Sequence, residues 1–157
     1  RGDVVVFRDS EGWLSPADQT GGSLWGTVGG WFGFAPQGSQ QIVVKRVIGV
    51  GGDTVACCDE EGRLTVNGQA VEEPYLAEGS QPSTSSFSVV VPEGTYWMMG
   101  DNRQNSADSL YHYQGGTAAF IPEESVIGRA QWQIWPLQKW SYLGNRDAFA
   151  KVPNADG

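Results

Sequence analysis

One lysine and one polar loop are the parts of this 157-residue chain whose side chains could do chemistry together. Lys45 lies within residues 42–50 (IVVKRVIGV), an apolar run typical of a strand that is buried on both faces. Removing a lysine from water favours its neutral form and lowers its pKa, so that the amine becomes able to accept a proton. Lys45 is therefore a candidate general base.

The polar loop at residues 100–109 (GDNRQNSADS) supplies hydroxyl, amide, carboxylate and guanidinium groups, among them Ser106 and Asp108. Both residues have an ordinary explanation, because serine is a common turn residue and a loop aspartate is usually solvated. Lys45 has one as well: its stem could pack in the sheet while the ammonium group reaches water beside Asp108 or Asp53. The chemical interpretation depends on these groups occurring together.

Arg46 directly follows Lys45, and successive side chains of a strand point to opposite faces. Both faces of this run are apolar, and a buried charge without compensation is strongly unfavourable. At least one of the two cations therefore needs a specific polar partner.

The composition indicates one all-β domain, with 22 glycines, 7 tryptophans and short apolar segments between turn signals. The formal charge of -8 excludes nucleic acid as a partner, since such binding needs a basic surface. With a single histidine, His112, and no Cys-x-x-Cys pair, neither a metal nor a cofactor is expected. The Cα atoms of Cys57 and Cys58 lie about 3.8 Å apart across a trans peptide, so two thiols, buried like small apolar residues, or a labile vicinal disulfide are expected.

Turn signals divide much of the chain into short extended segments. A hairpin with an Asn-Gly turn is predicted at residues 64–71, and a second hairpin is predicted from residues 87–91 and 95–99. The last strand is expected at residues 126–134, and the polar tail from Asn145 onward is expected to be frayed.

Residues 13–41 form an insertion rich in glycine and tryptophan. An apolar stripe at helical spacing runs from Leu24 to Phe32, but each glycine within it costs about 1 kcal/mol in a helix, so a loop or a marginal helix is expected. The segment is too interrupted to span a bilayer. Its aromatic rings suit a membrane interface or a peptide groove, or they cover the core of the protein itself.

Three segments occur in order along the chain: residues 2–7 (GDVVVF), 44–53 (VKRVIGVGGD) and 99–109 (MGDNRQNSADS). Together they resemble the bacterial type I signal peptidases, membrane-anchored serine proteases that remove signal peptides from secreted proteins. The glycine- and tryptophan-rich insertion and the Gly-Gly pair of the second segment look like the actinobacterial branch.

The resemblance implies a fold and a location. We expect residues 1–157 to form a single catalytic domain of bent antiparallel sheets of the signal-peptidase kind, with a small β-hairpin cap inserted at 56–90 and the 13–41 insertion near the membrane face. The resemblance also implies that the full-length protein is anchored at the extracytoplasmic face of the bacterial cell membrane and that this chain is a soluble fragment of it. The implied partners are the membrane surface and the signal peptides of secreted preproteins.

The resemblance also assigns roles to four residues. Lys45 matches the lysine that accepts the proton of the nucleophile, in place of the histidine of a Ser-His-Asp arrangement. Ser106 matches a second serine, whose hydroxyl orients the lysine amine. Asp108 and Arg46 match charged residues that brace the loop against the strand.

Two positions depart from the pattern of the family. Leu110 stands where the family usually has arginine, so Arg46 or Arg103 is expected to serve Asp108 alone. The family's nucleophile lies in a Ser-Met-x-Pro segment ahead of the strand at residues 2–7, and the chain contains no match to it. The chain by itself is therefore expected to be unable to cleave.

The substrate is expected to bind as an extended strand against the edge formed by Ile42, Val43 and Val44. Small apolar pockets there would fit the family's preference for small residues, usually alanine, at the first and third positions before the cut. The same three side chains could instead pack in the core.

Two other functions stay open. A self-cleaving repressor-type protease shares the Ser-Lys chemistry and a similar fold, although the loop at residues 100–109 fits it poorly. A catalytically inactive paralogue would bind extended peptides or a membrane partner without cutting them.

Overall fold

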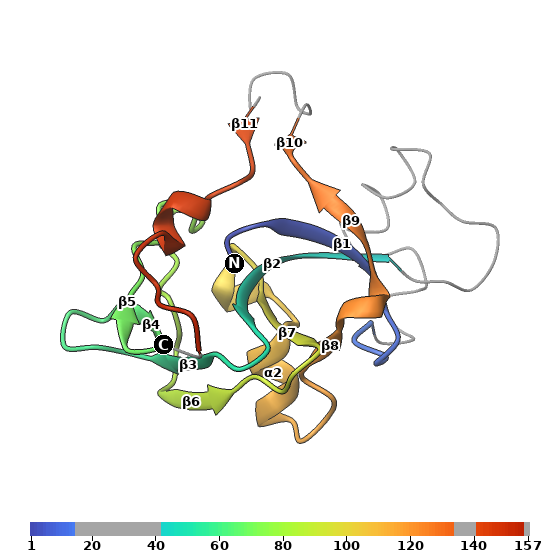
Figure 1. Ribbon diagram of the computed structural model, residues 1–157, viewed down its shortest axis with the longest axis horizontal. Helices are drawn as coiled ribbons and strands as arrows, with labels where there is room; N and C mark the ends of the chain where they lie inside the picture. The colour runs from blue at the N-terminus through green and yellow to red at the C-terminus, as the bar shows by residue number, and fades with distance from the viewer. Residues whose placement is uncertain (15–41, 134–140, 156–157) are drawn as a thin grey trace.

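The main body of the fold is a five-stranded antiparallel sheet (Figure 1). The computed structural model describes residues 1–14, 42–133 and 141–155, so most of the insertion expected at residues 13–41 lies outside the described residues. The strand order is β8-β7-β2-β1-β9. The strands are β1 (Val4–Arg8), β2 (Ile42–Val50), β7 (Thr95–Met99), β8 (Ile121–Pro122) and β9 (Val126–Ala130). The strand that carries Lys45, β2, is therefore central, between β1 and β7.

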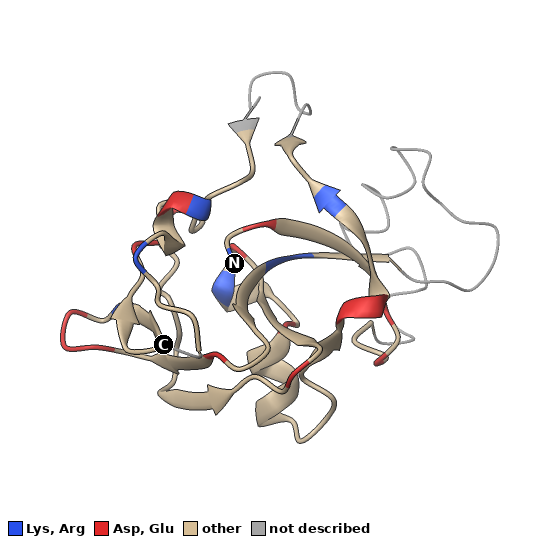
Figure 2. Ribbon diagram, in the orientation of Figure 1, with Lys and Arg blue, Asp and Glu red and all other residues tan. Residues whose placement is uncertain are grey.

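A second, four-stranded antiparallel sheet follows β2 and has the order β5-β4-β3-β6. Its strands are β3 (Thr54–Cys57), β4 (Leu64–Val66), β5 (Gln69–Ala70) and β6 (Phe87–Val90). Asn67 and Gly68 between β4 and β5 both have positive φ, 51° and 76°, as a two-residue type I′ turn requires. The predicted hairpin at 64–71 is confirmed. We call residues 54–90 the cap; its acidic β3–β4 loop lies at the end remote from the main sheet (Figure 2).

The remaining elements are short. A two-stranded pair joins β10 (Trp132–Gln133) to β11 (Ser141–Tyr142), and the helices are η1 (Arg103–Asn105), α2 (Ser109–Gln114), η2 (Glu123–Ser125) and η4 (Arg146–Phe149). The protein is all-β with antiparallel sheets, as predicted. Within the described part of the chain, none of the helices has the length and hydrophobicity that a membrane crossing needs.

Two apolar clusters cover opposite faces of β2. The first contains Ile48 and Trp97, both fully buried, and joins the main sheet to the cap. The second contains Val47 and Met98 and packs against β1. Neighbouring residues of β2 thus enter different clusters, which confirms burial on both faces for the part of the strand from Arg46 to Gly49.

The hairpin predicted from residues 87–91 and 95–99 is wrong. β6 pairs with β3 of the cap, whereas β7 pairs with β2 of the main sheet, so the intervening turn carries the chain from one sheet to the other. The cause lies at the start of the turn: Val91 N–H donates to Asp53 O at 2.8 Å, and Gly52 N–H donates to Val91 O at 2.9 Å. These bonds extend the β3–β6 pairing instead of closing a hairpin.

The tail was expected to be frayed from Asn145 onward, but its described part, residues 145–155, is docked. Phe149 is 5% exposed and Val152 is 9% exposed, and both belong to the cluster between the main sheet and the cap. Both apolar side chains gain by leaving water, and Arg146 donates to Asp3, so the segment docks although most of its residues are polar. The last strand is also broken, since β9 ends at Ala130 and the chain continues into β10, which pairs with β11.

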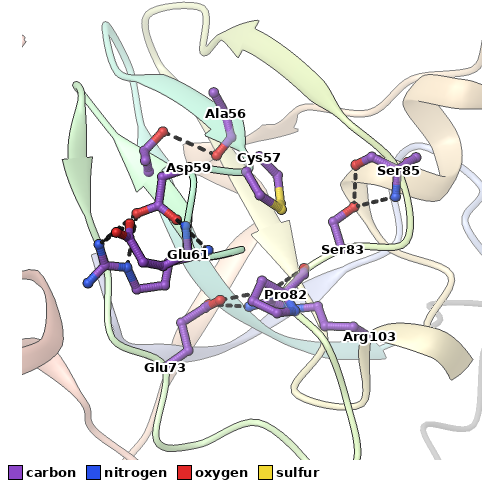
Figure 3. The surroundings of a disulfide bond; sticks show 12 residues. Ala56, Cys57, Asp59, Glu61, Glu73, Pro82, Ser83, Ser85 and Arg103 are labelled. Carbon is purple, nitrogen blue, oxygen red and sulfur yellow. Dashed lines mark hydrogen bonds and ion pairs between the residues drawn. A yellow bond between two sulfur atoms is a disulfide. The ribbon is translucent and has the colours of Figure 1, made fainter.

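Cys57 and Cys58 are joined by a disulfide at the end of β3 (Figure 3). Cys57 is buried in the cap, where it pairs with Leu64 of β4 and Phe87 of β6, and Cys58 is exposed. Of the two states that the sequence left open, the structure has the vicinal disulfide.

Gly49 sets how closely the cap approaches β2. A Cβ atom at this position would lie 2.5 Å from Val55 Cγ2 and 3.1 Å from Val91 Cγ2. We therefore expect Gly49→Ala to lower the free energy of unfolding by about 1–3 kcal/mol through overpacking, measured by urea denaturation. The matched control is Gly128→Ala in β9, where a Cβ would meet nothing within 4 Å. Equal effects of the two substitutions would contradict this explanation.

Candidate active site

Lys45 and Ser106 meet in the structure although 61 residues separate them. Lys45 lies opposite Val5 of β1, and its side chain leaves β2 on the same face as the buried Val43 and Val47. Its Nζ donates a hydrogen bond to Ser106 Oγ at 2.6 Å. The amine is thus held between an apolar sheet face and one hydroxyl group.

Burial lowers the pKa of Lys45 from the ordinary 10.5, and the carboxylate of Asp108 opposes this change. Desolvation is the larger effect because the charged ammonium form loses its hydration in the sheet. A larger share of the Lys45 side chains is therefore neutral at a given pH than for a lysine in water. A neutral amine has a free lone pair and can accept a proton.

Gly100 makes room for the Ser106 hydroxyl. A Cβ atom at residue 100 would lie 2.2 Å from Ser106 Oγ and 3.7 Å from Lys45 Nζ. Any side chain larger than hydrogen would therefore displace the serine hydroxyl from the lysine amine. Between these residues the loop makes one turn of 3-10 helix, η1, and Ser106 itself is extended.

Asp108 closes the loop on itself and caps α2. One carboxylate oxygen accepts from the N–H groups of Leu110 at 3.1 Å and Tyr111 at 3.4 Å, and the other accepts from Gly100 N–H at 3.1 Å. A carboxylate at this position satisfies free N–H groups and suits the positive end of the helix. Asp108 thereby fixes the two ends of the segment that contains Ser106.

Arg46 points away from Lys45, to the other face of β2, as side-chain alternation predicts; Figure 2 shows the two residues as the blue stretch of this strand. Its guanidinium forms a two-pronged ion pair with Asp101, at 2.8 Å from Nε to Oδ1 and 2.7 Å from Nη2 to Oδ2. Nη1 donates to the carbonyl oxygens of Gly2 and Leu143, both at 2.8 Å. Arg46 therefore has the specific partner that its burial requires.

One edge of β2 stays open beside Lys45. From Ile42 to Lys45 the strand pairs with β1, and pairing with β7 starts at Arg46, so among the described strands none covers the other edge of residues 42–45. Ile42 is 37% exposed and Val44 is 45% exposed, whereas Val43 is buried in the core. Packing therefore explains Val43 but not Ile42 or Val44. An open edge of this kind offers backbone N–H and C=O groups to an extended peptide.

A cleft of about 180 Å³ lies beside Ser106 and is lined in part by Met99, Leu110 and Tyr111. A larger hollow of about 420 Å³ lies between the cap and the tail, lined in part by Asn67 and Pro153, and contains none of the site residues. Of the predicted site residues, Ser106 and Asp108 line the smaller cleft, whereas Lys45 does not.

Residues 1–135 match the protein-family model described as signal peptidase, peptidase S26. The chain belongs to the bacterial type I signal peptidase family. Similar curated proteins include the probable signal peptidase I of Mycobacterium leprae, 35% identical with 92% of this chain and 58% of that protein covered, and the signal peptidase I of Mycobacterium tuberculosis, 36% identical with 90% and 54% covered. The mycobacterial relatives agree with the expected actinobacterial branch. The chain spans just over half the length of these relatives.

The fold of the family is seen in a crystal structure of a signal peptidase I from Enterococcus faecalis. It matches this chain with a TM-score of 0.51 and 28% sequence identity, over 83% of this chain and 94% of the other. The bent antiparallel sheets expected from the signal peptidase resemblance are therefore confirmed.

The prediction that Arg46 or Arg103 pairs with Asp108 is wrong. Arg46 pairs with Asp101 instead, and Arg103 donates to Glu73, to Pro82 O at 2.6 Å and to Gly100 O at 3.0 Å. The physical reason is that Arg46 lies on the face of β2 opposite Lys45 and Asp108. The Asp108 carboxylate is satisfied by backbone N–H groups, so the arginine that Leu110 replaces is not needed for that purpose.

Sequence reasoning missed three residues of this arrangement. Asp101 receives Arg46, Ser109 Oγ accepts the N–H of Met98 at 2.9 Å, and Glu73 receives Arg103. Asp101 could have been found, since it is a carboxylate in the same polar loop. Glu73 carried no local signal, because it lies in the cap, 30 residues before its partner.

In the ranges 1–14, 42–133 and 141–155, no group of three or more His, Cys, Asp and Glu side chains is arranged to hold a metal ion. His112 stacks on Trp13, with ring centroids 4.8 Å apart, and its Nδ1 contacts Thr117 Oγ1. His112 therefore packs against Trp13. Among the described residues it makes no hydrogen bond to Lys45 or Ser106.

The lowered pKa of Lys45 predicts a pH-dependent stability. Between this pKa and the ordinary 10.5, the unfolded chain binds more protons than the folded chain, so stability rises with pH in this window. Lys45→Met removes the charge and keeps an apolar stem, so we expect it to be more stable near neutral pH by about 1.4 kcal/mol for each pKa unit of lowering. Above pH 10.5 the gain should vanish.

The measurement is urea denaturation of both proteins from neutral to alkaline pH. Lys151→Met, at an exposed lysine, is the matched control and should leave the pH slope of the wild type unchanged. A Lys45→Met variant with the same slope as the wild type would refute the desolvation of this amine.

Proposed function

We propose that this chain is the catalytic domain of a serine endopeptidase that removes N-terminal signal peptides from secreted preproteins, with Lys45 as general base. The hydrogen bond of 2.6 Å between the desolvated Lys45 amine and Ser106 is the single observation that supports the proposal most. Membership of the signal peptidase family supports the substrate class.

The nucleophile is a serine outside residues 1–157, in a segment that precedes β1. Its hydroxyl proton passes to the neutral Nζ of Lys45 as its oxygen attacks the substrate carbonyl. The resulting ammonium group then gives this proton to the nitrogen of the leaving peptide, which leaves an acyl-enzyme. A water molecule, deprotonated by Lys45, then attacks the acyl carbonyl. The bond between this carbonyl and the serine oxygen breaks, the signal peptide leaves with a new carboxylate, and the Lys45 ammonium group returns its proton to the serine oxygen.

Ser106 orients the amine, and Asp108 holds the loop that presents Ser106. Arg46 fixes the same loop from the opposite face of β2 through Asp101. The signal peptide binds as an added strand along the open edge at residues 42–45, with its small side chains near Ile42 and Val44.

The membrane surface is the proposed second partner, at the extracytoplasmic face of the bacterial cell membrane. Trp132 and Tyr142 pack edge to face at 5.3 Å on the β10–β11 pair and are 64% and 54% exposed. In Figure 1 this pair projects from the body of the protein. Exposed aromatic rings of this kind suit the interface between lipid and water.

Substitution tests the two roles in a protein that carries the serine segment ahead of Gly2. We expect Lys45→Ala to lower kcat for preprotein cleavage by about 10²–10⁴-fold, the contribution of a general base. Ser106→Ala should cost at most about 100-fold, the lower end of this range, because it misplaces the base without removing it. Cleavage of a purified preprotein measures both. Undiminished cleavage by Lys45→Ala would refute the base, and peptide binding without any cleavage by the wild type would favour the inactive paralogue.

The pH profile gives an independent check. Because burial holds the pKa of Lys45 below the ordinary 10.5, kcat/KM for cleavage should rise as the pH passes through this lowered pKa and then level off. Ser106→Ala changes the surroundings of the amine and should move the midpoint of the rise. A rate that stays constant from neutral to strongly alkaline pH would contradict the proposal.

A further inference from the structure

A buried ion pair connects the cap to the loop that carries Ser106. Glu73 lies between β5 and β6 of the cap, and Arg103 is the first residue of η1, three positions before Ser106. Both side chains are 2% exposed. The two nitrogens Nη1 and Nη2 of Arg103 each donate to a different oxygen of Glu73. Dashed lines between Glu73 and Arg103 mark this contact in Figure 3. The pair is therefore dry and two-pronged.

Arg103 also holds the backbone around Ser106. Its Nη1 donates to Pro82 O of the cap at 2.6 Å, and its Nε donates to Gly100 O at 3.0 Å. Gly100 is the residue against which the Ser106 hydroxyl packs. If the Arg103 guanidinium moved, it would therefore move Gly100, and through Gly100 the Ser106 hydroxyl.

Tyr75 extends the same connection to the strand of Lys45. Its hydroxyl donates to Glu73 Oε1 at 2.8 Å, and its ring lies over the Arg46 guanidinium at 3.9 Å from Cζ to the ring centroid. Arg46 is the neighbour of Lys45 in β2. Two residues further along the cap, Ala77 N–H donates to Asp101 O at 3.0 Å, next to the ion pair of Arg46.

The cap thus contacts the neighbours of both Lys45 and Ser106: Tyr75 contacts Arg46, which follows Lys45 in β2, and Glu73 contacts Arg103 in the turn before Ser106. We infer that Glu73 and Tyr75 are positioning residues, which hold the Ser106 loop and β2 at the spacing that keeps the Lys45 amine dry and bonded to the serine hydroxyl. This inference rests on the proposed roles of Lys45 and Ser106.

The physical reason is the cost of a buried charge without a partner. In Glu73→Gln the carboxylate is replaced by a neutral amide. The Arg103 guanidinium then stays in a dry site without an oppositely charged partner. The guanidinium then gains by moving toward water, and it takes Gly100 and the loop with it. Water that enters beside Ser106 restores part of the hydration of the Lys45 ammonium form, which raises its pKa.

The cap also offers a matched control. Glu72 precedes Glu73 directly but is 76% exposed, and it pairs with Arg63 within the cap. Glu72→Gln makes the same chemical change as Glu73→Gln, one residue away, without touching the loop of Ser106.

The test is the titration of Lys45 in this chain, followed by NMR of isotopically labelled lysine side chains. The chain has only three lysines, so the signal of Lys45 is identified by its loss in Lys45→Met, and the other two serve as internal references. We expect Glu73→Gln to raise the pKa of Lys45 by at least about 0.5 and Glu72→Gln to leave it unchanged. Tyr75→Phe, which keeps the ring over Arg46 and removes the bond to Glu73, should give a smaller rise.

This readout does not depend on cleavage, so the inference and the proposed function can fail separately. If Glu73→Gln lowers the melting temperature but the folded protein keeps the wild-type or a lower pKa of Lys45, the ion pair is only structural and the inference is wrong. If Glu73→Gln does not fold, Tyr75→Phe decides: a raised pKa of Lys45 supports the positioning role, and an unchanged one overturns it. In the protein with the serine segment, Glu73→Gln should lower kcat about tenfold or more with little change in KM, since the peptide edge at residues 42–45 is untouched.

Discussion

The Lys45 amine has to lose most of its water and still keep one polar neighbour, and the rest of the structure serves that requirement. The dry side is local: β2 surrounds the stem of Lys45 with Val43, Val47 and the facing Val5 of β1. The polar side is remote, because Ser106 comes from a loop 61 residues further on. The position of that loop therefore decides whether the lysine is a base or an ordinary buried cation.

The loop is held by hydrogen bonds to charged groups at several points, and of these groups only Asp108 acts on the charge of the amine. Asp108 binds the two ends of the loop, Arg46 holds Asp101 on the far face of β2, and Arg103 ties the loop to Glu73 of the cap. Because side chains alternate along β2, Lys45 and Arg46 point to opposite faces. Asp101 can therefore compensate the charge of Arg46 without lying beside Lys45. Breaking a buried ion pair by removing one partner typically costs about 3–5 kcal/mol, which makes such pairs effective at excluding other loop positions.

Local patterns predicted much of the fold but failed where a segment had to choose between partners. The prediction was correct for the Asn67-Gly68 hairpin, whose turn type requires particular residues, and for the part of β2 from Arg46 to Gly49, which is buried on both faces. It was wrong for Ile42 and Val44, which are exposed. The segments at 87–91 and 95–99 look like a hairpin, yet they join different sheets, since β6 completes the cap beside β3. The polar tail docks through Phe149 and Val152, which join an apolar cluster built from residues of both sheets.

The sequence by itself determined the antiparallel β class, the opposite directions of Lys45 and Arg46, and the family to which these segments belong. Those properties follow from side-chain period, composition and short motifs, which are all local. Only the tertiary structure decided that Ser106 lies 2.6 Å from the amine, that Arg46 pairs with Asp101 and not Asp108, and that Glu73 of the cap reaches Arg103. Such contacts join residues far apart in the chain, and their choice depends on how the two sheets pack and which charges that packing buries, which no local pattern records.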